Sequence, residues 1–103
     1  MEIQSALHKL IEKKDLTEDE MTSVMYQIMD AGSQDSLVGA FLTALHMKGE
    51  CIGEIVGAAR VLRDRSETLA VAADPIVDTC GTGGDGADTF NISTAAAFVV
   101  AGA

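Results

Sequence analysis

The residues of this chain that are best suited to chemistry lie between Asp78 and Thr94. Four of the six residues from 81 to 86 are glycines, which allow positive φ and leave the backbone amides open to a ligand. Polar side chains follow at Thr89, Asn91, Ser93 and Thr94. A helix expected after them would add the positive end of its dipole. The pattern predicts a cradle for a phosphorylated ligand.

The charges around this segment indicate a metal ion. Three carboxylates, Asp78, Asp85 and Asp88, surround the glycines, and no lysine or arginine follows Arg65. Phosphate beside unpaired carboxylates would be repelled. A divalent cation such as Mg²⁺ relieves that repulsion by bridging phosphate and protein oxygens, and basic residues from sequence absent here would also relieve it. We expect both.

Two other interpretations of the glycine segment remain open from the residues alone. It is also explained as a turn between a strand and a helix, with Ser93 as an ordinary N-cap. Gly81, Gly83 and Gly86 satisfy the GxGxxG pattern of dinucleotide-binding folds, but the helix expected from Ala95 begins too far downstream. A Walker loop is excluded because no lysine follows the last glycine.

Four amphipathic helices are expected upstream of this segment. The first is predicted over Ile3 to Lys14, and the second from Glu18, after a capping box at Thr17, to an end at Gly32. The third is predicted to begin at a cap on Ser33 or Asp35 and to end at Gly49. The fourth is predicted over about Ile52 to Arg65. Their inward residues are predicted to be Ile3, Leu7, Leu10 and Ile11; Met21, Val24, Met25, Ile28 and Met29; Leu37, Val38, Phe41, Leu42 and Leu45; and Ile55, Val56, Ala59 and Leu62. Gly53 and Gly57, four residues apart, indicate a close approach of another backbone.

The pattern changes after this helical part. Residues 67–75 are expected to be a linker, because Pro75 stops helical continuation. Ile76 to Asp78 is predicted to be a short strand, and Ala95 to Ala103 a buried helix. The expected fold is therefore mainly α: a four-helix bundle domain over residues 1–66, then the first strand, loop and helix of an incomplete α/β domain over 76–103.

Composition excludes several classes of protein. The net charge is −9, so no basic surface for nucleic acid is expected. The longest apolar stretch, Thr94 to Ala103, is about half of what a bilayer crossing requires. The first residues lack the pattern of a signal peptide, which favours a cytoplasmic protein. Cys51 and Cys80 have no spacing typical of zinc ligands or disulfides.

Two motifs resemble a known family. The segment from Asp78 to Gly86 and the segment from Thr89 to Ala95 are similar to the signature of anthranilate phosphoribosyltransferases, enzymes of tryptophan biosynthesis. Upstream, residues 40–50 and 54–60 resemble the helical domain of that family. The resemblance therefore covers essentially the whole chain.

The resemblance implies a transferase in which the amine of anthranilate displaces diphosphate from C1 of phosphoribosyl diphosphate, with Mg²⁺ on the leaving group. The residues that it implies for binding phosphoribosyl diphosphate are Gly81, Gly84, Asp85, Thr89, Asn91, Ile92, Ser93 and Thr94. Ser93 would also bind Mg²⁺, and Gly81 would border the anthranilate pocket. A homodimer through the helical domain is implied too, with Leu37 and Phe41 as candidates for its face.

The chain also departs from the family pattern. The basic Lys-His-Gly-Asn-Arg segment, an anthranilate-binding arginine and an acidic pair for a second Mg²⁺ are missing, so we expect the 103 residues alone to be inactive. Cys51 replaces the usual threonine and His46 the usual arginine. The alternatives are a relative of pyrimidine-nucleoside phosphorylases, whose loop differs after its Thr-Gly-Gly, and a non-catalytic helical interaction module.

Overall fold

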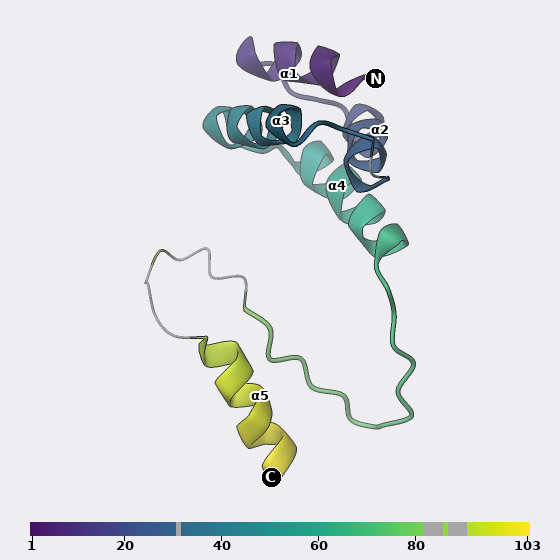
Figure 1. The fold of residues 1–103 in the computed structure, drawn as a ribbon, viewed down its shortest axis with the longest axis vertical. Coiled ribbons are helices and arrows are strands. Elements are labelled where there is room, and N and C mark those ends of the chain that lie inside the picture. Colours follow the sequence, from purple (N-terminus) through teal and green to yellow (C-terminus); the bar gives the residue numbers. More distant parts are fainter. Residues whose placement is uncertain (31, 82–85, 87–90) are drawn as a thin grey trace. The chain divides into compact units, whose positions relative to one another are not determined.

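The computed structural model describes residues 1–30, 32–81, 86 and 91–103. They form two compact units, Met1–Thr68 and Leu69–Ala103. The first unit contains α1 (Ile3–Ile11), α2 (Glu18–Met29), α3 (Asp35–Lys48) and α4 (Ile52–Arg65), and the second contains α5 (Ile92–Gly102) (Figure 1). Among the described residues the fold is mainly helical, as predicted. None of the described helices has the length and apolarity that crossing a bilayer requires.

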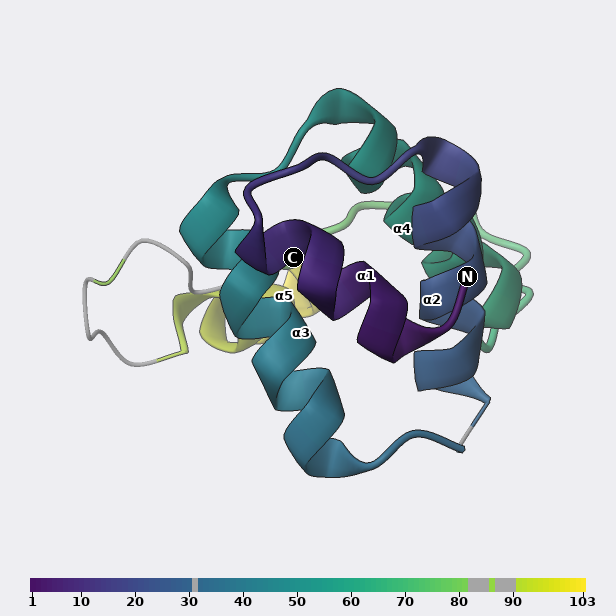
Figure 2. The ribbon, with the colours of Figure 1, turned by 90° about the horizontal axis from the view of Figure 1, so that it is seen from above.

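The helical unit is held together by two main helix pairs. Helix α1 packs on α3, and α2 packs on α4; Figure 2 shows the first pair crossing beside the second. The buried core combines residues from all four helices with Leu16 from the α1–α2 loop. Its members are Ile3, Ala6, Leu10, Leu16, Met21, Val24, Met25, Phe41 and Val61.

Most of the predicted helix signals are confirmed. Thr17 and Glu20 form the expected capping box, with the Glu20 amide donating to Thr17 Oγ1 at 3.2 Å and the Thr17 amide donating to Glu20 Oε2 at 2.8 Å. Gly49 ends α3 with a φ of 88°, and α4 has the predicted bounds. The cap of α3 was predicted wrongly, because its N-cap is Gln34 and makes no side-chain hydrogen bond.

The buried face of α4 differs from the predicted one. Ile55 and Leu62 are 57% and 48% exposed, whereas Glu54, Gly57 and Val61 are buried. Two interactions turn this other face inward. Glu54 accepts hydrogen bonds from the backbone amides of Leu16 and Cys51, each at 2.8 Å, which offsets the cost of burying a carboxylate.

Gly57 supplies the second interaction, and it confirms the predicted close approach of a backbone. A Cβ built on Gly57 would lie 2.6 Å from the carbonyl oxygen of Glu18 at the start of α2. Only glycine therefore allows α2 and α4 to pack at this separation. The prediction for Ile11 was also wrong, because α1 already ends there and its side chain is 63% exposed.

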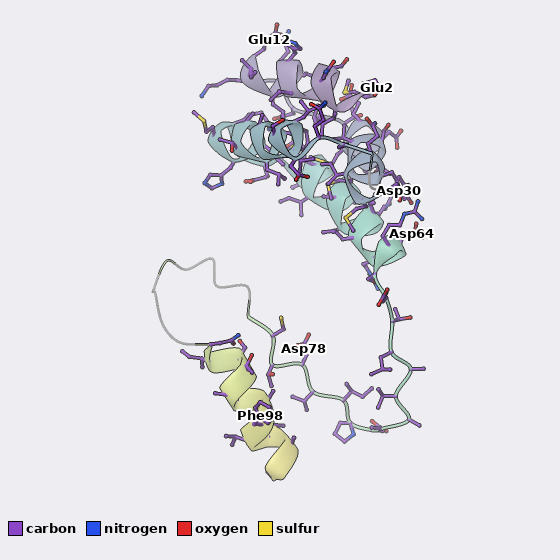
Figure 3. All side chains as sticks on the ribbon, in the orientation of Figure 1. Glu2, Glu12, Asp30, Asp64, Asp78 and Phe98 are labelled. Carbon is purple, nitrogen blue, oxygen red and sulfur yellow. The ribbon has the colours of Figure 1, made fainter. Side chains whose placement is uncertain are left out.

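The C-terminal ends of α2 and α4 are joined by an ionic cluster. Arg65 Nε and Nη2 donate to the two carboxylate oxygens of Asp30 at 2.8 and 2.9 Å, and the Arg65 guanidinium lies 4.7 Å from the centre of the Tyr26 ring. The Tyr26 hydroxyl donates to the Asp64 carboxylate at 3.0 Å, and this hydrogen bond raises the pKa of Tyr26. Figure 3 shows Asp30 and Asp64 on these neighbouring ends. The cluster links the last turn of α4 to the end of α2 at the surface of the unit.

The second unit differs from the prediction in two ways. Ile76 to Asp78 is not a strand, because among the described residues no other strand is present to share a hydrogen-bond ladder with it. Helix α5 begins at Ile92 instead of Ala95, and it contains no buried residue. Its Phe98, 77% exposed, projects from the helix in Figure 3.

Candidate functional site

The candidate site lies within the second unit, between residues 76–81 and the first turns of α5. A hollow of about 880 Å³ is lined by both segments. Its polar lining consists mainly of Asp78, Thr79, Asn91, Ser93 and Thr94, next to Gly81, and the rest of the lining is largely apolar, with Ile76, Val77, Ala97, Phe98 and Ala101. The hollow is large enough for a phosphorylated sugar, which needs a cavity of a few hundred Å³.

Asn91 starts α5 at the edge of this hollow. Its side-chain Oδ1 accepts a hydrogen bond from the amide of Thr94 at 2.9 Å. Asn91 is therefore the N-cap, and the interpretation of Ser93 as an ordinary N-cap is wrong. Ser93 instead lies in the first turn, where the helix dipole is positive and favours an anion.

Gly81 lies directly against Ser93. A Cβ built on Gly81 would be 2.8 Å from Ser93 Oγ, closer than carbon and oxygen can pack without one of them moving. The absence of a side chain at Gly81 therefore leaves the Ser93 hydroxyl in place beside the backbone. Five residues on, Gly86 has a φ of 67°, the left-handed conformation that glycine was predicted to supply in this loop.

The approach to Gly81 is also shaped by a local turn. Asp78 Oδ1 accepts a hydrogen bond from the amide of Cys80 at 2.8 Å, which forms an Asx turn just before the glycines. In Figure 3 the Asp78 side chain is seen on the segment beside α5. The carboxylate expected to face a bridging cation is thus partly engaged by its own backbone.

Four of the predicted site residues lie together around the hollow: Gly81, Asn91, Ser93 and Thr94. Ile92 belongs to the same first turn, but its side chain is 56% exposed and is not part of the lining. Gly84, Asp85 and Thr89 lie outside the described residues. Thr79, which was not predicted as a site residue, lines the hollow, and its place inside the Asp78–Gly86 motif was the one signal that could have identified it.

A second group of potential metal ligands lies in the helical unit. Side-chain atoms of Asp15, Cys51 and Glu54 all lie within 4.8 Å of one another. The ammonium of Lys48 is hydrogen-bonded to the two carboxylates, at 2.7 Å from Asp15 and 3.0 Å from Glu54. A lysine already supplies the positive charge there, so this group is an ion-pair junction of the fold.

Comparison with known proteins agrees with both units. The family model described as the glycosyl transferase family, helical bundle domain, matches residues 4–66. The chain belongs to the glycosyl transferase family. A second model, described as the α/β domain of that family, matches residues 73–103. The start of the second domain is therefore present in sequence, although its described residues form no strand.

Relatives in the family resemble the chain along its whole length. The anthranilate phosphoribosyltransferase of Anaeromyxobacter sp. (strain Fw109-5) is 56% identical over 98% of the chain, and that of Hahella chejuensis is 50% identical over all of it. The enzyme of Chloroflexus aurantiacus is 53% identical over all of it. The chain spans about 30% of the length of each relative. It is a homologue of the N-terminal region of these enzymes, as the resemblance of its motifs predicted. No solved structure matches the chain.

Proposed function

We propose that the chain is part of an anthranilate phosphoribosyltransferase and that its second unit binds phosphoribosyl diphosphate. The observation that carries the proposal is the contact of Gly81 with the Ser93 hydroxyl in the first turn of α5. It combines an open backbone, a hydroxyl and a helix N-terminus in one place, which suits a diphosphate. The identity to enzymes of that name over the whole chain supports the same ligand.

In the proposed reaction the amine nitrogen of anthranilate forms a bond to C1 of the ribose as the bond from C1 to the diphosphate oxygen breaks. The amine loses a proton and the diphosphate leaves with the bonding electrons. Such a transfer is accelerated mainly by positioning and by stabilising charge on the leaving group. The part of this chain is to hold the diphosphate with Gly81, Asn91, Ser93 and Thr94, and with Gly84, Asp85, Thr89 and Ile92 as proposed from the family. Gly81 would also border the anthranilate pocket.

The oxygen donors of the site fit a Mg²⁺ ion. Ser93 Oγ lies against Gly81 at the hollow, and the Asp78 carboxylate lines the same space; hydroxyl and carboxylate oxygens are the ligands that Mg²⁺ takes in proteins, usually together with phosphate oxygens. We propose Ser93 as a direct ligand. The ion would neutralise charge on the diphosphate, which none of the residues after Arg65 in this sequence could do as a lysine or arginine would.

The proposal includes a homodimer through the helical unit and a cytoplasmic location. Phe41 is buried in the core, so it is not part of a dimer face. The exposed apolar residues of α4, Ile52, Ile55 and Leu62, are better candidates. We expect Ile55→Asp to lower the molecular mass measured by light scattering, whereas the same substitution at a polar exposed position, Gln34→Asp, leaves the mass unchanged. An unchanged mass for Ile55→Asp would exclude this face.

Calorimetric titration tests the binding proposal. Phosphoribosyl diphosphate with Mg²⁺ is expected to bind the 103-residue chain saturably, and binding is expected to disappear when EDTA removes the metal. Ser93→Ala should weaken binding about tenfold or more, since it removes a metal ligand. Ser36→Ala, an exposed serine of α3, is the matched control and should bind like the original chain.

Two results would contradict the proposal. Equal binding by the Ser93→Ala and Ser36→Ala chains would exclude the assigned role of Ser93. Binding of a pyrimidine nucleoside with phosphate, and not of phosphoribosyl diphosphate, would favour a phosphorylase. The chain lacks basic residues at the site, so we also expect no release of diphosphate when anthranilate is added. A robust rate of release would overturn that expectation.

A further inference from the structure

Thr79 differs from every residue around it in the way it is buried. All other residues from 62 to 81 are exposed to solvent, and Thr79 alone is half-buried. Ser93, the residue that it faces, is half-buried as well, although its neighbours Ile92 and Thr94 are exposed. An extended segment without buried apolar residues has little else to hold it in place. The burial of Thr79 therefore marks the point where this segment is attached.

A hydrogen bond makes that attachment. Thr79 Oγ1 donates to the carbonyl oxygen of Ser93 at 3.3 Å. Between the described residues of 69–81 and those of α5, this is the one hydrogen bond present. It takes the place of the sheet ladder that residues 76–78 do not form. Because carbonyl oxygens have two lone pairs, Ser93 can accept it in addition to a helical amide.

The position of this bond determines where Gly81 lies. Gly81 is two residues after Thr79, and its backbone packs so closely on Ser93 that a built Cβ would come within 2.8 Å of Ser93 Oγ. We infer that Thr79 is a positioning residue of the diphosphate site, whose hydroxyl holds the Gly81 backbone against the Ser93 hydroxyl. The inference rests on the proposed function, since it assigns Thr79 to the site proposed there.

Three variants test this role. Thr79→Val keeps the shape of the side chain and removes the hydroxyl, and Thr79→Ser keeps the hydroxyl. Thr68→Val makes the same chemical change at an exposed position and serves as the control. The first measurement is the NMR amide shift and hydrogen exchange of Gly81 and Ser93 without any ligand. We expect shifts and faster exchange in Thr79→Val, with Thr79→Ser and Thr68→Val close to the original chain.

The second measurement is the calorimetric titration with phosphoribosyl diphosphate and Mg²⁺. Loss of one positioning hydrogen bond should weaken binding by Thr79→Val about fivefold. Rescue by Thr79→Ser distinguishes positioning through the hydroxyl from a general loss of structure, which would affect both variants.

The titration and the NMR comparison test the proposed function and the role of Thr79 independently of each other. If the original chain does not bind the ligand, the proposed binding function is contradicted, and the NMR comparison still decides whether Thr79 holds Gly81. If Gly81 and Ser93 have the same shifts and exchange in Thr79→Val as in Thr68→Val, the inference is overturned whatever the titration shows. Equal affinity of the Val and Ser variants for the ligand would overturn it as well.

Discussion

The ammonium of Lys48 lies 3.0 Å from the Glu54 carboxylate, and the two side chains are only 4% and 1% exposed. Asp15 and the carbonyl oxygen of Gly49 each accept a further hydrogen bond from the same ammonium at 2.7 Å. With the Leu16 and Cys51 amides bound to Glu54, the pair joins the α1–α2 loop, the end of α3 and the start of α4. A buried ion pair of this kind is stable only when all its polar atoms are satisfied, and here the partners are present.

Removing the charge of Glu54 should therefore destabilise the helical unit. Glu54→Gln leaves Lys48 with one carboxylate, that of Asp15. It also places a side-chain NH2 group near the Leu16 and Cys51 amides, which are donors themselves. We therefore expect a loss of about 3 kcal/mol in the free energy of unfolding. Urea denaturation followed by the fluorescence of Tyr26 measures this unit specifically, because the chain has one tyrosine and no tryptophan. Glu12→Gln is the control, since Glu12 and Lys14 form an exposed pair, and it should change little. Equal effects of the two variants would show that the buried junction contributes no more than a surface pair.

Acid should reduce the difference between the original chain and Glu54→Gln. Burial by itself would raise the pKa of Glu54, but hydrogen bonds from the Cys51 and Leu16 amides and from Lys48 outweigh it, so the pKa lies below its ordinary value of 4.5. A carboxylate with a lowered folded pKa adds stability above its ordinary value and loses it as the pH falls through the folded pKa. Urea titrations at several pH values should show a constant difference near neutrality and a shrinking one below about pH 4.5. A difference that stays constant into acid would contradict the assignment of the stability to the ionised form.

Gly57→Ala should destabilise the packing of α2 on α4. The added methyl group would meet the Glu18 carbonyl oxygen at 2.6 Å and Met21 Cβ at 3.1 Å, so the helices must separate, at a cost of about 1–3 kcal/mol. The control is Gly39→Ala on α3, where nothing lies within 4 Å of the built Cβ. That change should stabilise by about 0.5–1 kcal/mol through helix propensity. The thermal midpoints of the two variants should therefore move in opposite directions, and movement in the same direction would contradict the close packing.

Cys51→Thr should stabilise the start of α4. Cys51 is the N-cap of this helix, and its sulfur is a weaker acceptor than a hydroxyl oxygen. Threonine at an N-cap is worth about 0.5–1 kcal/mol more than a residue that cannot accept a strong hydrogen bond. The free energy of unfolding should rank Thr above Cys and Cys at or above Ala. A threonine variant no more stable than Cys51→Ala would show that a side-chain acceptor at this N-cap adds nothing to the stability of α4.

Much of the helical unit could be predicted from the sequence because its signals are local. The Thr17 capping box, the Gly49 terminus and the bounds of α4 each depend on residues within a few positions of one another. Buried positions on α2, such as Met21 and Val24, follow from helical spacing alone. Helical spacing predicted the wrong buried face for α4, because Ile55 was expected in the core and is exposed. The choice between its two faces depends on contacts with residues more than thirty positions away, such as the bond from Leu16 to Glu54.

The sequence by itself determined the family and the segment that carries the candidate site, because glycines and hydroxyls at fixed spacing constrain what a backbone can bind. It also determined that this segment is negatively charged and contains no lysine or arginine, which is the basis of the proposed cation. Tertiary structure decided which of these groups meet. The contact of Gly81 with Ser93 and the hydrogen bond of Thr79 to the same residue join positions twelve and fourteen residues apart, and spacing along the chain does not specify such pairs. The burial of Glu54 with Lys48 was decided in the same way, because a carboxylate enters a core only where folding brings all its partners to it.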